Sequence, residues 1–108
     1  MFGKIAKWIL DTGRGVDLVS KKDVSHAGKH IEAAARAAIV ATATVSTKAA
    51  KVCRASMPAL SEEIVPYVLD DTPPVLSVGL RCKHYGYEFH WFPHRPPFMV
   101  TPDGKDYG

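Results

Sequence analysis

Apolar residues in this sequence occur in short runs, each of which is cut off by glycine, proline or aspartate. The run Trp8-Ile9-Leu10 stops at Asp11-Thr12-Gly13, and the run at 75–78 stops at Gly79. Short apolar runs bounded by turn-forming residues are typical of buried β-strands, whereas amphipathic helices show longer stretches with apolar residues three or four positions apart. The chain is therefore expected to be mainly β, with two or three short helices.

The order of the expected elements follows from the residues within and between these runs. Ser20 is a suitable N-cap for a short helix, and Gly86 is a suitable stop for another. An alanine-rich stretch has high helix propensity, but the β-branched residues from Ile39 onward favour a change to strand. The expected helices cover 20–26, 31–38 and 80–86, and the expected strands lie at about 7–10, 16–19, 39–45, 47–53, 64–69, 75–79, 87–91 and 98–100.

Length and charge limit the classes of protein to which the chain can belong. Its 108 residues suffice for one small domain with one core, so we expect a single domain over 1–108. The net charge of +3 is small and the basic residues are scattered, so nucleic-acid binding is not expected. No apolar run approaches the ~20 residues of a membrane span. The best motif lies at the very start and a turn signal at the end, which indicates a fragment of a longer polyprotein.

The cysteines and histidines do not indicate a cofactor. Cys53 and Cys82 are far apart and form no C-x-x-C motif, which favours free thiols in a reducing, intracellular (cytoplasmic) setting. Cys82 is close to His84, His90 and His94, but their spacing matches no zinc template. We therefore expect no metal and no cofactor.

The motif with the clearest chemical meaning is Asp11-Thr12-Gly13. An aspartate at the end of an apolar strand, followed by glycine, is most often just a turn. Here a second apolar strand, at 75–79, also ends in glycine and is followed by a helical pattern. Two such strands give the motif a context that a chance tripeptide would lack.

Two blocks of the sequence resemble retropepsin-type domains in copia-like retrotransposon polyproteins. The residues 8–13 followed by 17–20 are similar to their active-site segment. The stretch 66–82 followed by 86–89 is similar to a second block, in which a leucine-serine-valine-glycine strand leads to a helix and a glycine-tyrosine strand. Both blocks occur in the right order and at a fitting separation. The resemblance implies a retropepsin-like (acid protease) closed β-barrel half with a few short helices.

The resemblance also implies an activity and a set of site residues. Asp11 would be the catalytic carboxylate of an aspartic endopeptidase, which becomes complete when two copies of the chain pair as a homodimer. Its substrate would be a polypeptide, namely the polyprotein that contains the domain. Thr12, Gly13 and Gly15 would support the active-site loop, with the two glycines allowing backbone angles closed to other residues. The supporting strand would contribute Leu76, Val78 and Gly79.

Two departures from the family pattern bear on activity. The flap, a hairpin that closes over the substrate, would cover about 39–53, and its tip lacks the usual Asn-Gly; the tip candidates are Thr42, Ala43, Thr44 and Val45. Arg14 stands where relatives more often have a small residue. An inward guanidinium would favour two ionised carboxylates, which leaves no proton to donate, whereas an outward one would matter little. The alternative function is therefore a catalytically decayed domain with a structural or interaction role.

Other chemically active residues have simpler interpretations. Asp70-Asp71 is expected to lie in a solvated loop, because neighbouring side chains on an extended segment point opposite ways. Asp17 and Asp23 are expected to be surface and capping residues. An aromatic cluster could be a stacking platform for single-stranded nucleic acid, although core and edge packing is the simpler interpretation; it comprises Phe89, Trp91, Phe92 and Phe98, with His90 and Arg95 nearby.

Overall fold

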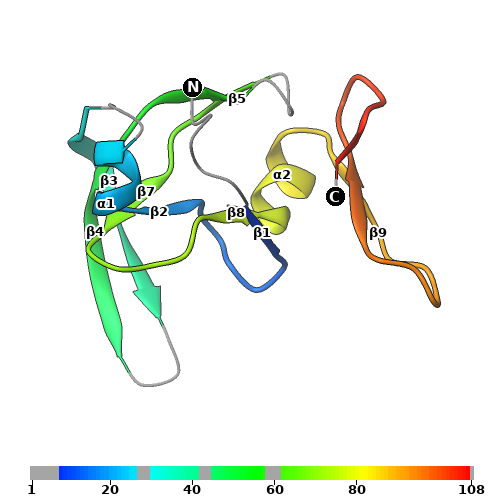
Figure 1. Cartoon of the computed structure of the whole chain (residues 1–108), viewed down its shortest axis with the longest axis horizontal. Coiled ribbons are helices and arrows are strands. Elements are labelled where there is room, and N and C mark those ends of the chain that lie inside the picture. The colour runs from blue at the N-terminus through cyan, green and yellow to red at the C-terminus, as the bar shows by residue number, and fades with distance from the viewer. Residues whose placement is uncertain (1–7, 27–29, 42–44, 58–61, 108) are drawn as a thin grey trace.

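A computed structural model of the chain describes residues 8–26, 30–41, 45–57 and 62–107, which form short strands and two short helices (Figure 1). The strands are β1 (Ile9–Asp11), β2 (Leu18–Ser20), β3 (Glu32–Ala41), β4 (Ser46–Val52), β5 (Ala55–Met57), β6 (Glu62–Ile64), β7 (Tyr67–Leu69), β8 (Val75–Ser77), β9 (Glu88–His90), β10 (Phe98–Val100) and β11 (Asp106–Tyr107). The helices are α1 (Lys21–His26) and α2 (Val78–His84). The prediction of a mainly β chain with short helices is confirmed.

The largest sheet is mixed and open. Its strands follow the order β1-β8-β2-β7-β4-β3, and two smaller antiparallel sheets contain β11-β10-β9 and β5-β6. The described strands do not close into a barrel, because β1 and β3 lie at opposite ends of the strand order and do not pair with each other. The expectation of a closed barrel half is therefore corrected to an open six-stranded sheet with two smaller sheets.

Strand β8 lies between β1 and β2, although β1 and β2 are neighbours in the sequence. It pairs with β1 in parallel, with Leu10 opposite Leu76 and Asp11 opposite Ser77. It meets β2 in the antiparallel sense at Leu18 and Val75. The loop that joins β1 to β2 must therefore pass around the end of β8, and this brings residues that are more than sixty positions apart into contact.

Two clusters of buried residues hold this arrangement together. Val19 and Leu76 belong to the larger cluster, which also includes Met99, whereas their strand neighbours Leu18 and Val75 belong to the smaller one. Successive side chains of a strand point to opposite faces, so the two clusters lie on opposite sides of the central strands. Strands β2 and β8 are buried on both faces, which gives the β1–β2 loop a rigid base.

The alanine-rich segment is the largest error of the sequence-based prediction. Most of the residues expected to form a helix over 31–38 belong instead to β3, which pairs with β4 as an antiparallel hairpin whose register shifts between Ala33 and Ala38. The pairing buries Val40 and Ala49, and the hydroxyl of Tyr67 donates a hydrogen bond to the Arg36 carbonyl at 2.6 Å. Helix propensity differs by only tenths of a kcal/mol per residue, so such tertiary contacts outweigh it.

The helices begin where serine side chains cap them. The Ser20 hydroxyl accepts a hydrogen bond from the Asp23 N–H at 3.1 Å, which confirms the predicted cap of α1. Ser77 caps α2 in the same way, through the N–H of Leu80 at 3.0 Å. Helix α2 therefore begins at Val78, two residues earlier than expected, and Gly79 lies in the helix and not in the preceding strand.

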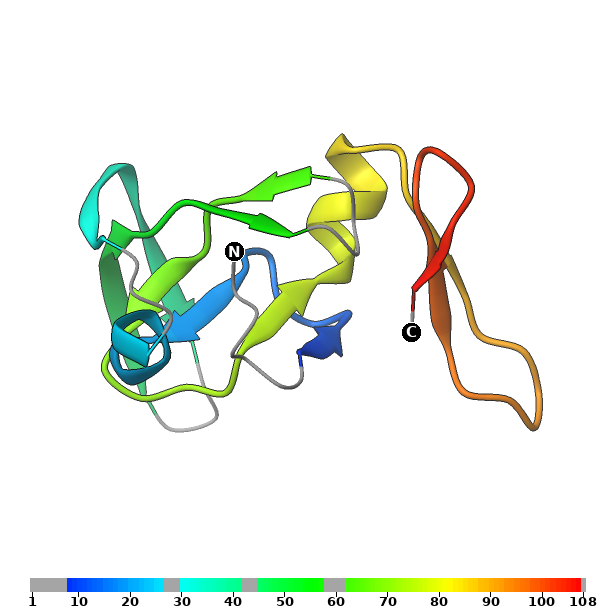
Figure 2. The same cartoon turned by 45° about the horizontal axis from the view of Figure 1, so that its top comes forward.

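Two further segments differ in detail from the expected elements. The strand expected over 64–69 is broken into β6 and β7 around Pro66, which has no N–H to donate to a strand partner. The C-terminal sheet of β9, β10 and β11 stands beyond α2 (Figure 2) and contributes the fully buried Met99 to the larger cluster. Neither described helix has the length and apolar character needed to cross a bilayer.

Candidate active site

Asp11 is the last residue of β1 and lies at an accessible strand end. Its Oδ1 atom accepts a hydrogen bond from the N–H of Gly13 at 2.7 Å. About a third of the side chain is exposed (36%), so solvent reaches the carboxylate. Pairing with Ser77 on the buried strand β8 fixes the backbone of Asp11. The carboxylate is thus oriented by its own loop while it remains open to a reactant.

The glycines of this loop have different roles. A Cβ atom added at Gly13 would lie 3.3 Å from Asp11 Oδ1, so the close approach of the backbone to the carboxylate requires glycine. An added Cβ at Gly15 would meet nothing within 4 Å. Neither residue has a left-handed φ; the described glycines that do are Gly86 and Gly104. The expected need for unusual backbone angles at Gly13 and Gly15 is therefore wrong, and Gly13 is favoured by space instead.

Ser77 stabilises the Asp11 loop through hydrogen bonds of its side chain. Its buried hydroxyl donates to the Arg14 carbonyl at 2.5 Å and accepts the N–H of Leu80 at 3.0 Å, so one side chain joins the loop to α2. Thr12 is exposed, and its hydroxyl has no hydrogen-bond partner among the described residues of this single chain. The other residues expected to support the loop lie below and beside it: Leu76 and Val78 are buried, and an added Cβ at Gly79 would lie 3.9 Å from the Arg14 carbonyl oxygen.

A buried ion pair, which the sequence did not reveal, anchors the far end of the loop. Arg81 donates from Nη1 to Asp17 Oδ1 at 2.6 Å and from Nη2 to Oδ2 at 2.8 Å. Asp17 Oδ1 also accepts the N–H of Ser77 at 2.7 Å. Only 6% of the Asp17 side chain and 1% of the Arg81 side chain are exposed, so the expectation of a surface Asp17 is wrong. Burial is possible because the bidentate geometry satisfies both charged groups.

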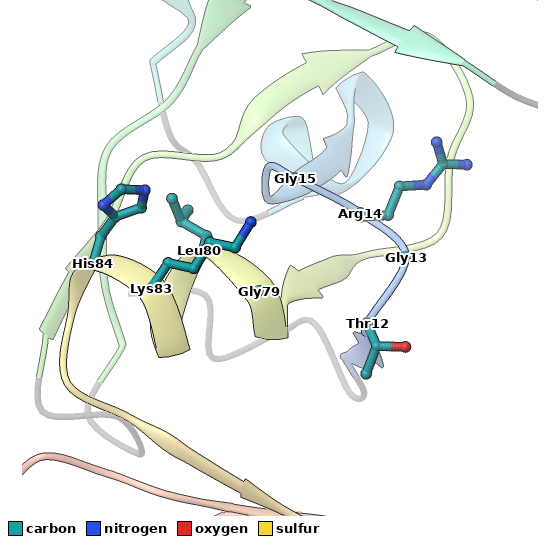
Figure 3. Close-up of a pocket in the computed structure, with 8 residues that line it drawn as sticks. All are labelled: Thr12, Gly13, Arg14, Gly15, Gly79, Leu80, Lys83 and His84. Atoms are coloured by element: carbon teal, nitrogen blue, oxygen red, sulfur yellow. The ribbon is translucent and has the colours of Figure 1, made fainter.

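Arg14 points inward, toward Asp11 and the hairpin. Its Nη1 donates to the carbonyl of Ala41, the last residue of β3, at 2.5 Å. Its Nε lies 4.0 Å from Asp11 Oδ2, and 29% of the side chain is exposed. In Figure 3 the guanidinium extends away from Lys83 and His84. Of the two orientations considered from the sequence, the structure therefore has the inward one.

The hairpin of β3 and β4 corresponds in position to the expected flap. Its last described pair is Ala41 opposite Ser46. Of the four tip candidates, Val45 is exposed, and Thr42, Ala43 and Thr44 lie outside the described residues. The hydrogen bond from Arg14 joins the end of this hairpin to the Asp11 loop.

A pocket of about 380 Å³ lies between the Asp11 loop and α2 (Figure 3). The loop contributes small residues, and the helix contributes two basic side chains at its C-terminal end. The lining residues are Thr12, Gly13, Arg14, Gly15, Gly79, Leu80, Lys83 and His84. The pocket is basic and adjoins the loop that carries Asp11.

The remaining candidates are separate from the Asp11 loop in their contacts. Asp70 and Asp71 are exposed, as expected for a solvated loop, and Asp70 forms an ion pair with Lys21 at 3.5 Å. The described residues contain no group of three or more histidine, cysteine, aspartate or glutamate side chains that could hold a metal ion. Cys53 is buried and Cys82 is exposed, and neither is part of a disulfide bond.

Part of the aromatic cluster stacks on itself, and Phe89 packs against the larger buried cluster. The ring of His90 stacks on Phe92 with 5.6 Å between centroids and on Phe98 with 5.3 Å. The Arg95 guanidinium lies 5.2 Å above the Phe92 ring. Trp91 is exposed. These rings already stack on one another, which agrees better with edge packing than with an open platform for bases.

Two shifted pKa values mark the C-terminal sheet. Burial raises the pKa of Tyr107, and the positive charge of Arg81 opposes this effect in part. The hydroxyl of Thr101 donates to Asp103 and lowers the pKa of that carboxyl, an effect to which Lys105 adds. The Tyr107 hydroxyl is therefore influenced by the guanidinium of Arg81 as well as by burial.

The Asp11 loop is therefore held at both ends by residues from β8 and α2, and its carboxylate is exposed beside an arginine that reaches the hairpin. No known protein-family model and no curated protein matches this sequence. The site is consequently defined by the geometry of its own residues.

Proposed function

We propose that this chain is one subunit of a homodimeric, retropepsin-like aspartic endopeptidase that hydrolyses peptide bonds of its own polyprotein. The observation that carries the proposal is the Asp11 carboxylate, which is exposed at a strand end and oriented by the N–H of Gly13 at 2.7 Å. The position of β8 beside this loop agrees with the supporting strand that the family resemblance implies.

The chemistry requires a second carboxylate, which a two-fold axis supplies by placing two Asp11 side chains face to face. Two carboxylates within hydrogen-bond reach do not both ionise readily, so they share one proton. The ionised carboxylate takes a proton from water, the resulting hydroxide attacks the scissile carbonyl, and the protonated carboxylate donates to the carbonyl oxygen. Collapse of the tetrahedral intermediate then breaks the C–N bond and releases the amine with a proton from the dyad.

The buried network supports this proposal, because a dyad needs carboxylates held in a fixed geometry. Ser77 holds the Arg14 carbonyl and Arg81 holds Asp17, so both ends of the Asp11 loop are tied to buried elements. The hairpin reaches the same loop through Ala41, as a cover over bound substrate would.

The direct test incubates the full chain with a library of unstructured peptides at about five pH values between roughly 3 and 8. The products are identified by mass spectrometry. We expect cleavage that Asp11→Asn abolishes and that Asp71→Asn, a change to an exposed aspartate, leaves intact. Sedimentation equilibrium should show a dimer at the concentrations that cleave. Cleavage that survives Asp11→Asn, or a strictly monomeric active chain, would refute the proposal.

A second candidate, the catalytically decayed domain, is favoured by one specific observation. Arg14 spans the space between Asp11 and the hairpin, where substrate would have to lie. If the chain is decayed, the wild-type dimer should cleave no peptide at any pH, and Arg14→Ser should restore cleavage. An active wild-type dimer would exclude this candidate.

A further inference from the structure

Arg14 occupies the space that a substrate of Asp11 would enter, and it has hydrogen-bonding capacity to spare. A guanidinium carries five N–H donors in a planar fork. One of its nitrogen atoms donates to the Ala41 carbonyl at 2.5 Å, while Nε lies 4.0 Å from Asp11 Oδ2, beyond hydrogen-bond distance. A polypeptide that lies over Asp11 must therefore meet this guanidinium.

We propose that Arg14 selects polypeptide substrates that carry a carboxylate side chain within two residues of the scissile bond. The inference rests on the proposed function of Asp11 and names the substrate class of that same site. Substrate that separates the hairpin from the loop breaks the bond to the Ala41 carbonyl, and it covers an arginine side chain that is 29% exposed in the free chain. The guanidinium then needs a new acceptor from the substrate.

A carboxylate is a better new acceptor than the carbonyl it replaces. A carboxylate adds the attraction between opposite charges to the hydrogen bond, and its planar shape lets it accept two N–H donors of arginine at once. Exchange of the Ala41 carbonyl for a glutamine amide replaces one neutral acceptor by another, whereas exchange for a glutamate carboxylate gains an ion pair. The difference corresponds to about a five- to tenfold preference for glutamate over glutamine.

The distance to Asp11 defines where the carboxylate must lie. Arg14 Nε is 4.0 Å from the Asp11 side chain, which would contact the reacting carbonyl. Residues of an extended peptide are about 3.3 Å apart along the chain, so the acidic residue lies within two positions of the cut. The two-fold axis of the proposed dimer supplies an Arg14 on each side of the dyad, so either flank can carry it.

Removal of Arg14 should reverse the preference and not merely weaken it. Without the guanidinium, a substrate carboxylate would face the negative charge of the Asp11 dyad, and like charges at this distance repel. Arg14→Ser should therefore favour the glutamine peptide. Arg14→Lys, which keeps the charge but loses the planar fork, should retain a reduced preference for glutamate.

The experiment compares two peptides that differ only by glutamate or glutamine two residues from the cut. For each, kcat/KM is measured with the wild-type full chain, Arg14→Ser and Arg14→Lys. Arg54→Ser is the matched control, because it makes the same change of net charge at an exposed arginine paired with Glu32. Affinity of both peptides for the Asp11→Asn chain is measured in parallel by fluorescence anisotropy.

We expect the wild type and Arg54→Ser to prefer glutamate about five- to tenfold, and Arg14→Ser to prefer glutamine. Cleavage without a glutamate preference, or a preference that survives Arg14→Ser, overturns the role of Arg14 and leaves the proposed protease intact. If no chain cleaves either peptide, the proposed function fails. In that case equal affinities of the two peptides for Asp11→Asn overturn the selectivity as well.

Discussion

Removal of one partner of the Asp17–Arg81 ion pair is expected to cost a large part of the stability of the molecule. The two side chains are 6% and 1% exposed and share two hydrogen bonds, at 2.6 and 2.8 Å. Breaking a buried pair by removal of one charge typically costs about 3–5 kcal/mol, because the other charge stays buried. Small domains have only about 5–15 kcal/mol in total, so either single change should lower the denaturation midpoint severely.

The pair can be separated from its surroundings by a double-mutant cycle. The variants are Asp17→Asn, Arg81→Met and the double variant, and urea unfolding is followed by far-UV circular dichroism. The double variant buries no charge at either position and should be more stable than the sum of the single changes allows, by about 2–3 kcal/mol. Added salt should change these costs little, because screening acts weakly on buried groups.

Arg54→Met is the control for this cycle. Arg54 pairs with Glu32 at 3.0 Å, but both side chains are about half exposed. Exposed pairs contribute about 0–1 kcal/mol, so the control should remain near the wild-type stability. Single changes at Asp17 and Arg81 that cost no more than this control, or a double variant that equals their sum, would refute the reasoning.

Five further substitutions test other parts of the structure. Gly104→Ala should cost about 1–2 kcal/mol, because the residue has a φ of 87°, whereas Gly15→Ala should lie within about 0.5 kcal/mol of the wild type in the same urea titration. Ser77→Ala should cost about 1–2 kcal/mol, because two hydrogen bonds of a buried hydroxyl are lost, and should reduce peptide cleavage; Thr72→Ala, at a hydroxyl away from the loop, should do neither. Burial raises the pKa of Tyr107 above 10.0, so the folded state holds this proton more tightly and stability should fall as the pH rises past about 10. Tyr107→Phe should remove that loss of the urea midpoint.

Local patterns predicted the elements whose structure is decided locally. The run that ends at Asp11 is a strand, the segment after Ser20 is a helix, and both follow from short-range chemistry. The segment 32–41 was misjudged because its alanines favour helix intrinsically, while its partner β4 lies further along the chain. The intrinsic helix propensity of a segment does not include the contribution of a strand partner that it meets only in the folded chain.

The site could be predicted only where one residue carries the chemistry. The sequence indicates Asp11 as a candidate through its position after an apolar run, and Gly13 stands next to it in the same motif. Asp17 and Arg81 are 64 residues apart, and nothing in the sequence near either one indicates the other. The orientation of Arg14 depends on its hydrogen bond to Ala41. Ala41 belongs to β3, and the sequence predicts a helix for most of that strand.

The Asp-Thr-Gly tripeptide is therefore a weak predictor alone, because the geometry that makes it a candidate site is supplied from elsewhere. Ser77 donates its N–H to Asp17, donates its hydroxyl to the Arg14 carbonyl and caps α2. Arg81, one helical turn later, donates to Asp17 and to the Ser77 carbonyl. A serine and an arginine four residues apart, at the junction of a buried strand and a helix, thus fix both ends of the loop. A sequence that kept the tripeptide but lost this pair would keep the carboxylate without the means to hold it in place.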